Sequence, residues 1–337
     1  MYRYNPLQHP LEIRVIRFGT ALAVSDPHLQ VTISHVRLDK RPVYKALSYT
    51  WGDTTLKEIV ECDNGGGQLL ITANCALALR RLRLEDELTP IWIDSICINQ
   101  NDIPERNQQI LLISDVYRLV SKVQVYLGEE DEDSALGMAY FRDPRKFLAQ
   151  QEEGRGFLDV SAIAEQPKQA VNRILSRAWF GRVWVFQEVL VSSAVDVLCG
   201  SDKVTWSQLT TSIWAWGGRN RIFLKEGIKE PPILFRFAEK RNRSSALEIL
   251  LRYMHEARSS KSTDPRDKIY AVLGIAADTA AGFLPFRPDM NFEGKESYKL
   301  RGTPIHFTAP YLKNEPRGEI AELSLADLGV ICYHVLA

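Results

Sequence analysis

This sequence has no excess of charge and no long apolar run, and each absence excludes a class of protein. Its 42 basic residues balance 42 acidic ones, so it lacks the positive field of a dedicated nucleic-acid or anionic-membrane binder. No uncharged apolar run approaches the ~18–20 residues that a membrane-spanning helix needs. The first twenty residues carry charges and lack the apolar core of a secretory signal. We therefore expect a cytoplasmic protein that binds no nucleic acid and spans no membrane.

Cysteine and histidine are sparse and dispersed. No two of the five cysteines have C-x-x-C spacing, and their odd number fits reduced thiols better than a disulfide framework. The six histidines form no local cluster with the spacing of zinc ligands. Cys97 follows Ile96 and has no neighbouring histidine, which favours a buried thiol over a nucleophile. We expect no metal ion and no bound cofactor.

Short apolar segments that are typical of buried strands alternate with segments of helical periodicity. This alternation favours βαβ units, and so an α/β fold with a mostly parallel sheet that is flanked by helices. The second predicted helix begins with a capping-box-like sequence, Asp102 to Glu105, that has Pro104 in its first turn. The predicted strands cover residues 46–49, 91–94, 122–127 and 194–198, and the predicted helices cover residues 74–83 and 102–120.

The length of 337 residues predicts two domains, or one large domain with an extension. We assign the α/β core to residues 1–200, with its motif-bearing part in residues 40–200. Beyond residue 200 the pattern becomes helical, over residues 206–216, 246–258 and 266–275. These segments predict a helical C-terminal extension over residues 201–290, followed by an irregular tail over residues 291–337.

A run of three glycines, residues 65–67, follows an alternating apolar segment and precedes another. A phosphate-binding loop would need a helix, or a lysine followed by serine or threonine, directly after its glycines, and neither is present. The run therefore predicts the turn of a β-hairpin.

Several motifs in one order resemble the fungal heterokaryon incompatibility (HET) domain. The resemblance covers residues 1–290, whereas residues 300–337 match no part of the family. The motifs lie at residues 44–53 (YKALSYTWGD), 91–100 (IWIDSICINQ), 105–106 (ER), 125–128 (VYLG), 177–188 (RAWFGRVWVFQE), 198–200 (LCG) and 264–274 (DPRDKIYAVLG).

The resemblance implies a role in fungal allorecognition, in which contact with non-self triggers regulated cell death. HET domains also look distantly like Toll/interleukin-1 receptor (TIR) domains, which have a flavodoxin-like parallel sheet and in some proteins cleave NAD. By that analogy the chain is an NAD glycohydrolase that breaks the bond between nicotinamide and ribose. The alternative is a non-enzymatic signalling or self-assembly module that acts through protein partners.

Glu188 is the catalytic candidate. Residues 184–188 resemble the W-x-x-x-E helix that carries the catalytic glutamate of TIR enzymes. Trp184 and Glu188 are four positions apart on a predicted helix, so their side chains are neighbours. An apolar neighbour raises the pKa of a carboxyl by desolvation, which suits a group that acts near neutral pH. The alternative is that Glu188 pairs with Arg182 or Arg177 and anchors the helix.

The residues that follow two predicted strands are the candidates for contact with NAD, because ligands of open α/β sheets bind outside the carboxyl ends of the strands. Trp51 would stack on a base, Gly52 would allow close approach of the backbone, and Asp53 would bond a ribose hydroxyl. For Asp94 the alternative is a cap on nearby backbone donors. Trp184, from the helix of Glu188, completes the predicted set of Ser48, Tyr49, Trp51, Gly52, Asp53, Asp94 and Trp184.

Other polar and aromatic motifs have a structural interpretation. Residues 99–102 form a polar turn that closes on itself. Arg106 either holds a phosphate or pairs with Glu105 or Asp102. Residues 264–268 form a charged, capped helix start that docks the extension onto the core. The tryptophans at positions 206, 214 and 216 fit a core or an interface better than a cofactor site.

Overall fold

The computed structural model describes residues 1–19, 27–63, 65–86, 88–147 and 164–217, together with a few single positions between 257 and 275. The chain divides into two compact units, Met1–Lys240 and Arg241–Ala337, and the fold given below is that of the first. Within the helix predicted over 266–275, positions 267, 268, 271 and 275 are described and helical. The tail predicted over 291–337, and nearly all of the helix predicted over 246–258, lie outside the described residues.

In the described residues, nine strands form one mixed sheet in the order β5-β4-β2-β1-β6-β3-β7-β8-β9. The neighbours β6, β3, β7 and β8 are parallel to one another, and the pairs β1–β2, β1–β6, β4–β5 and β8–β9 are antiparallel. The strands are β1 (Glu12–Phe18), β2 (Leu29–Arg37), β3 (Lys45–Tyr49), β4 (Lys57–Cys62), β5 (Gly67–Thr72), β6 (Ile91–Trp92), β7 (Lys122–Tyr126), β8 (Val195–Cys199) and β9 (Asp202–Thr205).

Helices flank this sheet, which confirms the predicted α/β class, and the parallel strands lie inside the sheet. In the part of the chain that is described, no helix is long and apolar enough to cross a membrane. The α-helices are α1 (Ala73–Glu85), α2 (Asp94–Cys97), α3 (Ile103–Leu119), α4 (Ser134–Arg142), α5 (Glu165–Leu175), α6 (Val185–Leu190) and α7 (Trp206–Gly217), and the 3-10 helices are η1 (Leu38–Lys40), η2 (Pro144–Phe147) and η4 (Ala178–Gly181).

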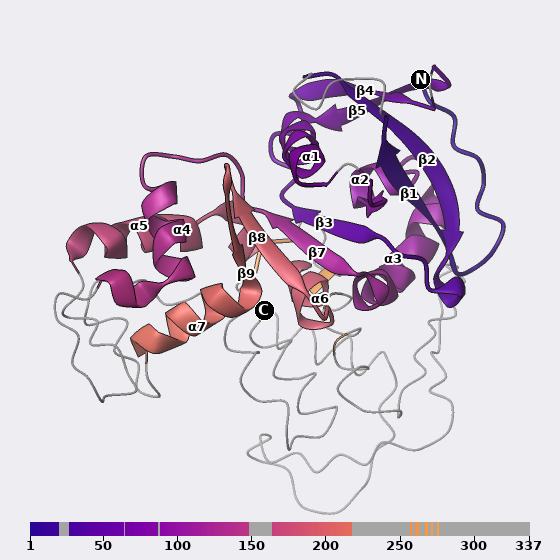
Figure 1. Cartoon of the computed structure of the whole chain (residues 1–337). Coiled ribbons are helices and arrows are strands. Elements are labelled where there is room, and N and C mark those ends of the chain that lie inside the picture. The colour runs from indigo at the N-terminus through magenta and orange to yellow at the C-terminus, as the bar shows by residue number, and fades with distance from the viewer. Residues whose placement is uncertain are drawn as a thin grey trace, which may run out of the picture. The chain divides into compact units, whose positions relative to one another are not determined.

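The central strand β3 shows which helices lie on which face of the sheet. Successive side chains of a strand point to opposite faces. The Tyr49 hydroxyl bonds Ser95 of α2 at 2.7 Å, whereas the Ser48 hydroxyl bonds Glu188 of α6. Figure 1 accordingly shows α1 on one side of β3 and β7 and α6 on the other. Ser48 thus faces α6 from the carboxyl end of β3.

Two local signals in the sequence form as predicted. Asp102 caps α3, because its carboxylate accepts a hydrogen bond from the Glu105 backbone N–H at 3.0 Å, and Pro104 lies in the first turn. The glycine run ends a hairpin: β4 and β5 pair antiparallel from Lys57 with Thr72 to Cys62 with Gly67. Gly65 in the turn has a φ of 98°, a conformation that glycine adopts without strain.

A buried ion pair joins β1 to α3. The side chain of Arg14 has no exposed surface, and its two terminal nitrogens lie 2.6 and 2.9 Å from the Glu105 carboxylate oxygens. The same guanidinium donates to the backbone carbonyls of Cys97 and Asn5. It lies 4.8 Å from the centre of the Tyr4 ring, within cation–π distance. Glu105 therefore pairs with Arg14 and not with Arg106.

We expect Asp86→Asn to lower the free energy of unfolding by about 1–2 kcal/mol at pH 7. The Asp86 carboxylate, after the end of α1, accepts from the Lys45 ammonium at 2.7 Å and the Thr89 hydroxyl at 2.6 Å. These bonds hold its pKa in the folded protein below the ordinary value of 3.8. The stabilisation is therefore present above pH 3.8 and is lost as the pH falls below that value. Urea titrations at pH 7 and at acidic pH should show the wild type and variant converging in acid; a constant difference would contradict the assignment.

Candidate functional site

Polar side chains from four segments meet at the carboxyl end of β3. We call them the edge cluster. The strand β3 contributes one residue, the start of α2 another, the η4 turn and the position after it two more, and α6 the last. The edge cluster consists of Ser48, Asp94, Trp179, Arg182 and Glu188.

Glu188 is the centre of the edge cluster. It is 5% exposed, and its Oε2 accepts a hydrogen bond from the Ser48 hydroxyl. The Ser48 oxygen in turn accepts from the Trp179 indole N–H at 2.7 Å. The Arg182 guanidinium lies 3.4 Å from each Glu188 oxygen. Burial raises the pKa of Glu188, whereas Arg182 and Ser48 oppose this rise.

Asp94 links the edge cluster to the surface. Its Oδ2 accepts from the Trp51 indole N–H at 2.9 Å, and its Oδ1 accepts from the backbone N–H of Ser95 at 2.7 Å. Burial raises the pKa of Asp94, and the Arg182 charge opposes that rise. Arg182 thus interacts with both carboxyls. Trp51 is 37% exposed, so the cluster reaches solvent through its ring.

Other residues of the predicted set lie outside this network. Tyr49 is buried, and its hydroxyl faces α2 on the other side of the sheet. Asp53 accepts from the backbone and hydroxyl of Thr55, two positions on. Gly52 has a φ of 70°, and a Cβ there would lie 3.1 Å from Asn74. Trp184 immediately precedes α6, and its backbone carbonyl accepts a hydrogen bond from the backbone N–H of Glu188.

The structure decides between the two partners that the sequence left open for Glu188. Arg182 is its partner, whereas Arg177 lies 3.0 Å from Asp131. Trp179 was not among the predicted site residues, although it lies in the same motif as Glu188. Trp179 is 1% exposed, and its ring packs edge-on against that of Trp206, with 6.2 Å between the ring centres. Nothing in the sequence indicates that its indole N–H bonds Ser48.

The structural interpretations of two motifs agree with the described residues. The backbone N–H of Asp102 bonds the carbonyl of Asn99, so the polar turn closes on itself. Cys97 is buried, and burial raises its pKa to about 12, which leaves the thiol unreactive near neutral pH. Among the described residues, no group of three or more His, Cys, Asp or Glu side chains could hold a metal ion. The side chains of Trp214 and Trp216 and most of residues 264–268 lie outside the described residues.

The stretch of the chain that holds the edge cluster matches a known family. The model of the heterokaryon incompatibility (HET) protein family matches residues 44–188, a range that begins before Ser48 and ends at Glu188. The chain contains a HET domain. All five residues of the edge cluster lie within this HET domain.

A curated relative extends the similarity beyond the HET domain. It is "Heterokaryon incompatibility protein 6, OR allele" of Neurospora crassa, which is 30% identical over 336 residues. The match covers 82% of this chain and 49% of the relative, so the chain spans about half the length of that protein. No solved structure matches the chain.

Proposed function

We propose that this protein acts in fungal allorecognition, where its HET domain triggers regulated cell death after contact with non-self. The HET-family match over residues 44–188 carries the proposal. The similarity to a protein named for heterokaryon incompatibility supports it.

Inducible expression of the chain in a filamentous fungus tests this role. We expect growth arrest and uptake of a membrane-impermeant dye by the expressing cells. Expression of residues 1–240, the first compact unit, should show whether this unit is sufficient. Unchanged growth at high levels of folded full-length protein would contradict the proposal.

We further propose that the edge cluster cleaves NAD. The observation that favours this activity is a carboxylate with a raised pKa, Glu188, beside Asp94 and Arg182 at the carboxyl end of parallel strands. In the reaction, the bond between nicotinamide and ribose C1′ breaks, and nicotinamide leaves with the bonding electrons. Glu188 would stabilise the positive charge that develops on the ribose. Water then adds to C1′ and releases a proton, which gives ADP-ribose.

The burial of Glu188 favours the alternative, a non-enzymatic module that acts through self-assembly or protein partners. Both carboxylate oxygens are engaged, by Arg182 and by Ser48. For the enzyme, Arg182 would have to release Glu188, and the pyrophosphate of NAD offers this guanidinium a second anion. Purified protein incubated with NAD decides between the two: free nicotinamide supports the enzyme, and its absence supports the module.

A further inference from the structure

The β4–β5 hairpin presents an apolar surface to solvent. Along β4 the side chains of Lys57, Ile59 and Glu61 are exposed. Val60 and Cys62, which point to the opposite face of the strand, are buried. Ile59 and Leu70 are direct partners in the β4–β5 register and are 53% and 59% exposed. Leu56, just before β4, is 58% exposed. We call Leu56, Ile59 and Leu70 the hairpin patch.

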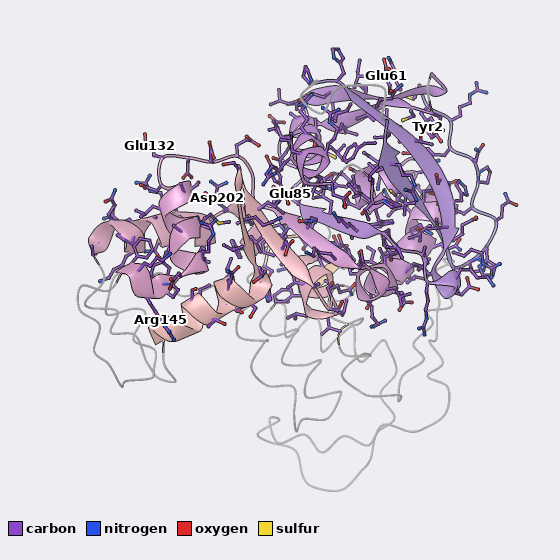
Figure 2. The ribbon with its side chains drawn as sticks, in the orientation of Figure 1. Tyr2, Glu61, Glu85, Glu132, Arg145 and Asp202 are labelled. Atoms are coloured by element: carbon purple, nitrogen blue, oxygen red, sulfur yellow. The ribbon has the colours of Figure 1, made fainter. Side chains whose placement is uncertain are left out.

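Charges of opposite sign lie on either side of the hairpin patch. Lys57 precedes Ile59 by two positions and Glu61 follows it by two, so all three point to the same face. Figure 2 shows Glu61 on the outer side of β4, away from the helices. Within the described part of the chain, neither Lys57 nor Glu61 has an ion-pair partner. The strand β5 itself, Gly67–Thr72, carries no charge.

This arrangement is complementary to itself. Two copies can face each other across a two-fold axis that lies in the plane of the contact. The axis runs perpendicular to the strands and passes over the Ile59–Leu70 pair. Ile59 then contacts Ile59 of the second copy, and Leu70 contacts its Leu70. The axis also places Lys57 of each copy against Glu61 of the other. A surface with like charges at both ends of the patch would repel its own copy, and this one does not.

We propose that the outer face of the β4–β5 hairpin binds a second copy of this chain through an isologous, face-to-face contact. The apolar residues of the hairpin patch supply the area removed from water, and the two Lys57–Glu61 pairs set the antiparallel orientation. The surface is separate from the edge cluster, so the proposal holds whether or not the protein cleaves NAD.

Sedimentation velocity of the full chain at concentrations up to about 100 µM tests the proposal. We expect the wild type to form a reversible dimer and Leu70→Lys to weaken dimerisation about tenfold or more, because two buried ammonium groups would face each other. Leu84→Lys is the matched control. Leu84 is 61% exposed on α1, so the same change there should leave the dimer intact.

Charge exchange tests the orientation. Lys57→Glu places four acidic groups in the contact, Glu61→Lys places four basic ones, and each variant alone should be monomeric. An equimolar mixture of the two should form a heterodimer, and the double variant should again form a homodimer. A wild type that stays monomeric, a Leu84→Lys variant that dissociates like Leu70→Lys, or a mixture that fails to associate would overturn the proposal. Thermal unfolding of every variant checks that these exposed substitutions leave the fold intact.

Discussion

Glu188→Gln should reduce the release of nicotinamide from NAD by about 10²–10⁴-fold, because a neutral amide cannot stabilise the positive charge that develops on the ribose. The amide keeps the size of the carboxyl group and can still accept the hydrogen bond from Ser48. The variant should lose some stability, because it removes one carboxylate from Arg182, but Asp94 still faces the Arg182 charge. We therefore expect a folded protein whose loss of stability is no larger than that of the control described next. Initial rates of the folded variant and wild type, measured at equal protein concentration, give the comparison.

A matched control for this variant is Asp196→Asn. Asp196 is 6% exposed and lies 2.9 Å from the Lys122 ammonium. It is therefore also a buried, ion-paired carboxylate. It lies near the amino ends of β7 and β8, whereas the edge cluster lies at the carboxyl end of the parallel strands. The control should lose stability and keep its turnover. If the wild type is active and Glu188→Gln retains near-full turnover, the catalytic assignment is wrong. If Glu188→Gln fails to fold, Glu188 serves mainly to hold α6 onto β3.

Glu105→Gln should destabilise the protein by about 3–5 kcal/mol, because it leaves the buried Arg14 charge without its counter-charge. Both terminal nitrogens of Arg14 bond the Glu105 carboxylate, and one of its oxygens also accepts the Asn99 backbone N–H at 2.8 Å. The loss should appear in the free energy of unfolding from denaturant titrations.

A second pair on α3 provides the comparison for Glu105→Gln. Asp115 lies 2.5 Å from Arg118, but its side chain is 47% exposed, so Asp115→Asn should cost less than about 1 kcal/mol. The double variant Arg14→Met with Glu105→Leu should recover much of the loss, since apolar groups of similar volume often replace a buried ion pair without a net cost. Equal effects of Glu105→Gln and Asp115→Asn would show that the Arg14–Glu105 pair contributes no more than a surface contact.

Sequence patterns predict the elements whose signals are local. The apolar runs of β3, β7 and β8 and the capped start of α3 need no distant partner to be recognised. The strand β1 was not predicted, because Arg14 points into the core and the run reads as charged and exposed. Its burial depends on Glu105, which lies 91 positions later. At β6 the strand is only Ile91–Trp92, since Asp94 already begins α2.

The same distinction applies to the edge cluster. Strand ends indicated Ser48 and Asp94, and the resemblance of residues 184–188 to the catalytic helix of TIR domains indicated Glu188. The structure places the three residues in one network. Trp179 was missed, because only the packing of η4 beside β3 brings its N–H to Ser48. Tyr49 was included although the alternation of side chains along β3 turns it to the other face. Whether the network binds NAD stays a prediction.

The separation of Ser48 and Glu188 along the chain affects when the protein becomes competent during synthesis. The two residues are 140 positions apart. Contacts of such long range form slowly, because the entropy of closing the loop is lost before the contact stabilises the fold. A ribosome-bound chain that has emerged only as far as β7 holds the serine without its carboxylate. Under the proposed cleavage of NAD by the edge cluster, the nascent chain would therefore stay inactive until α6 has left the ribosome and docked.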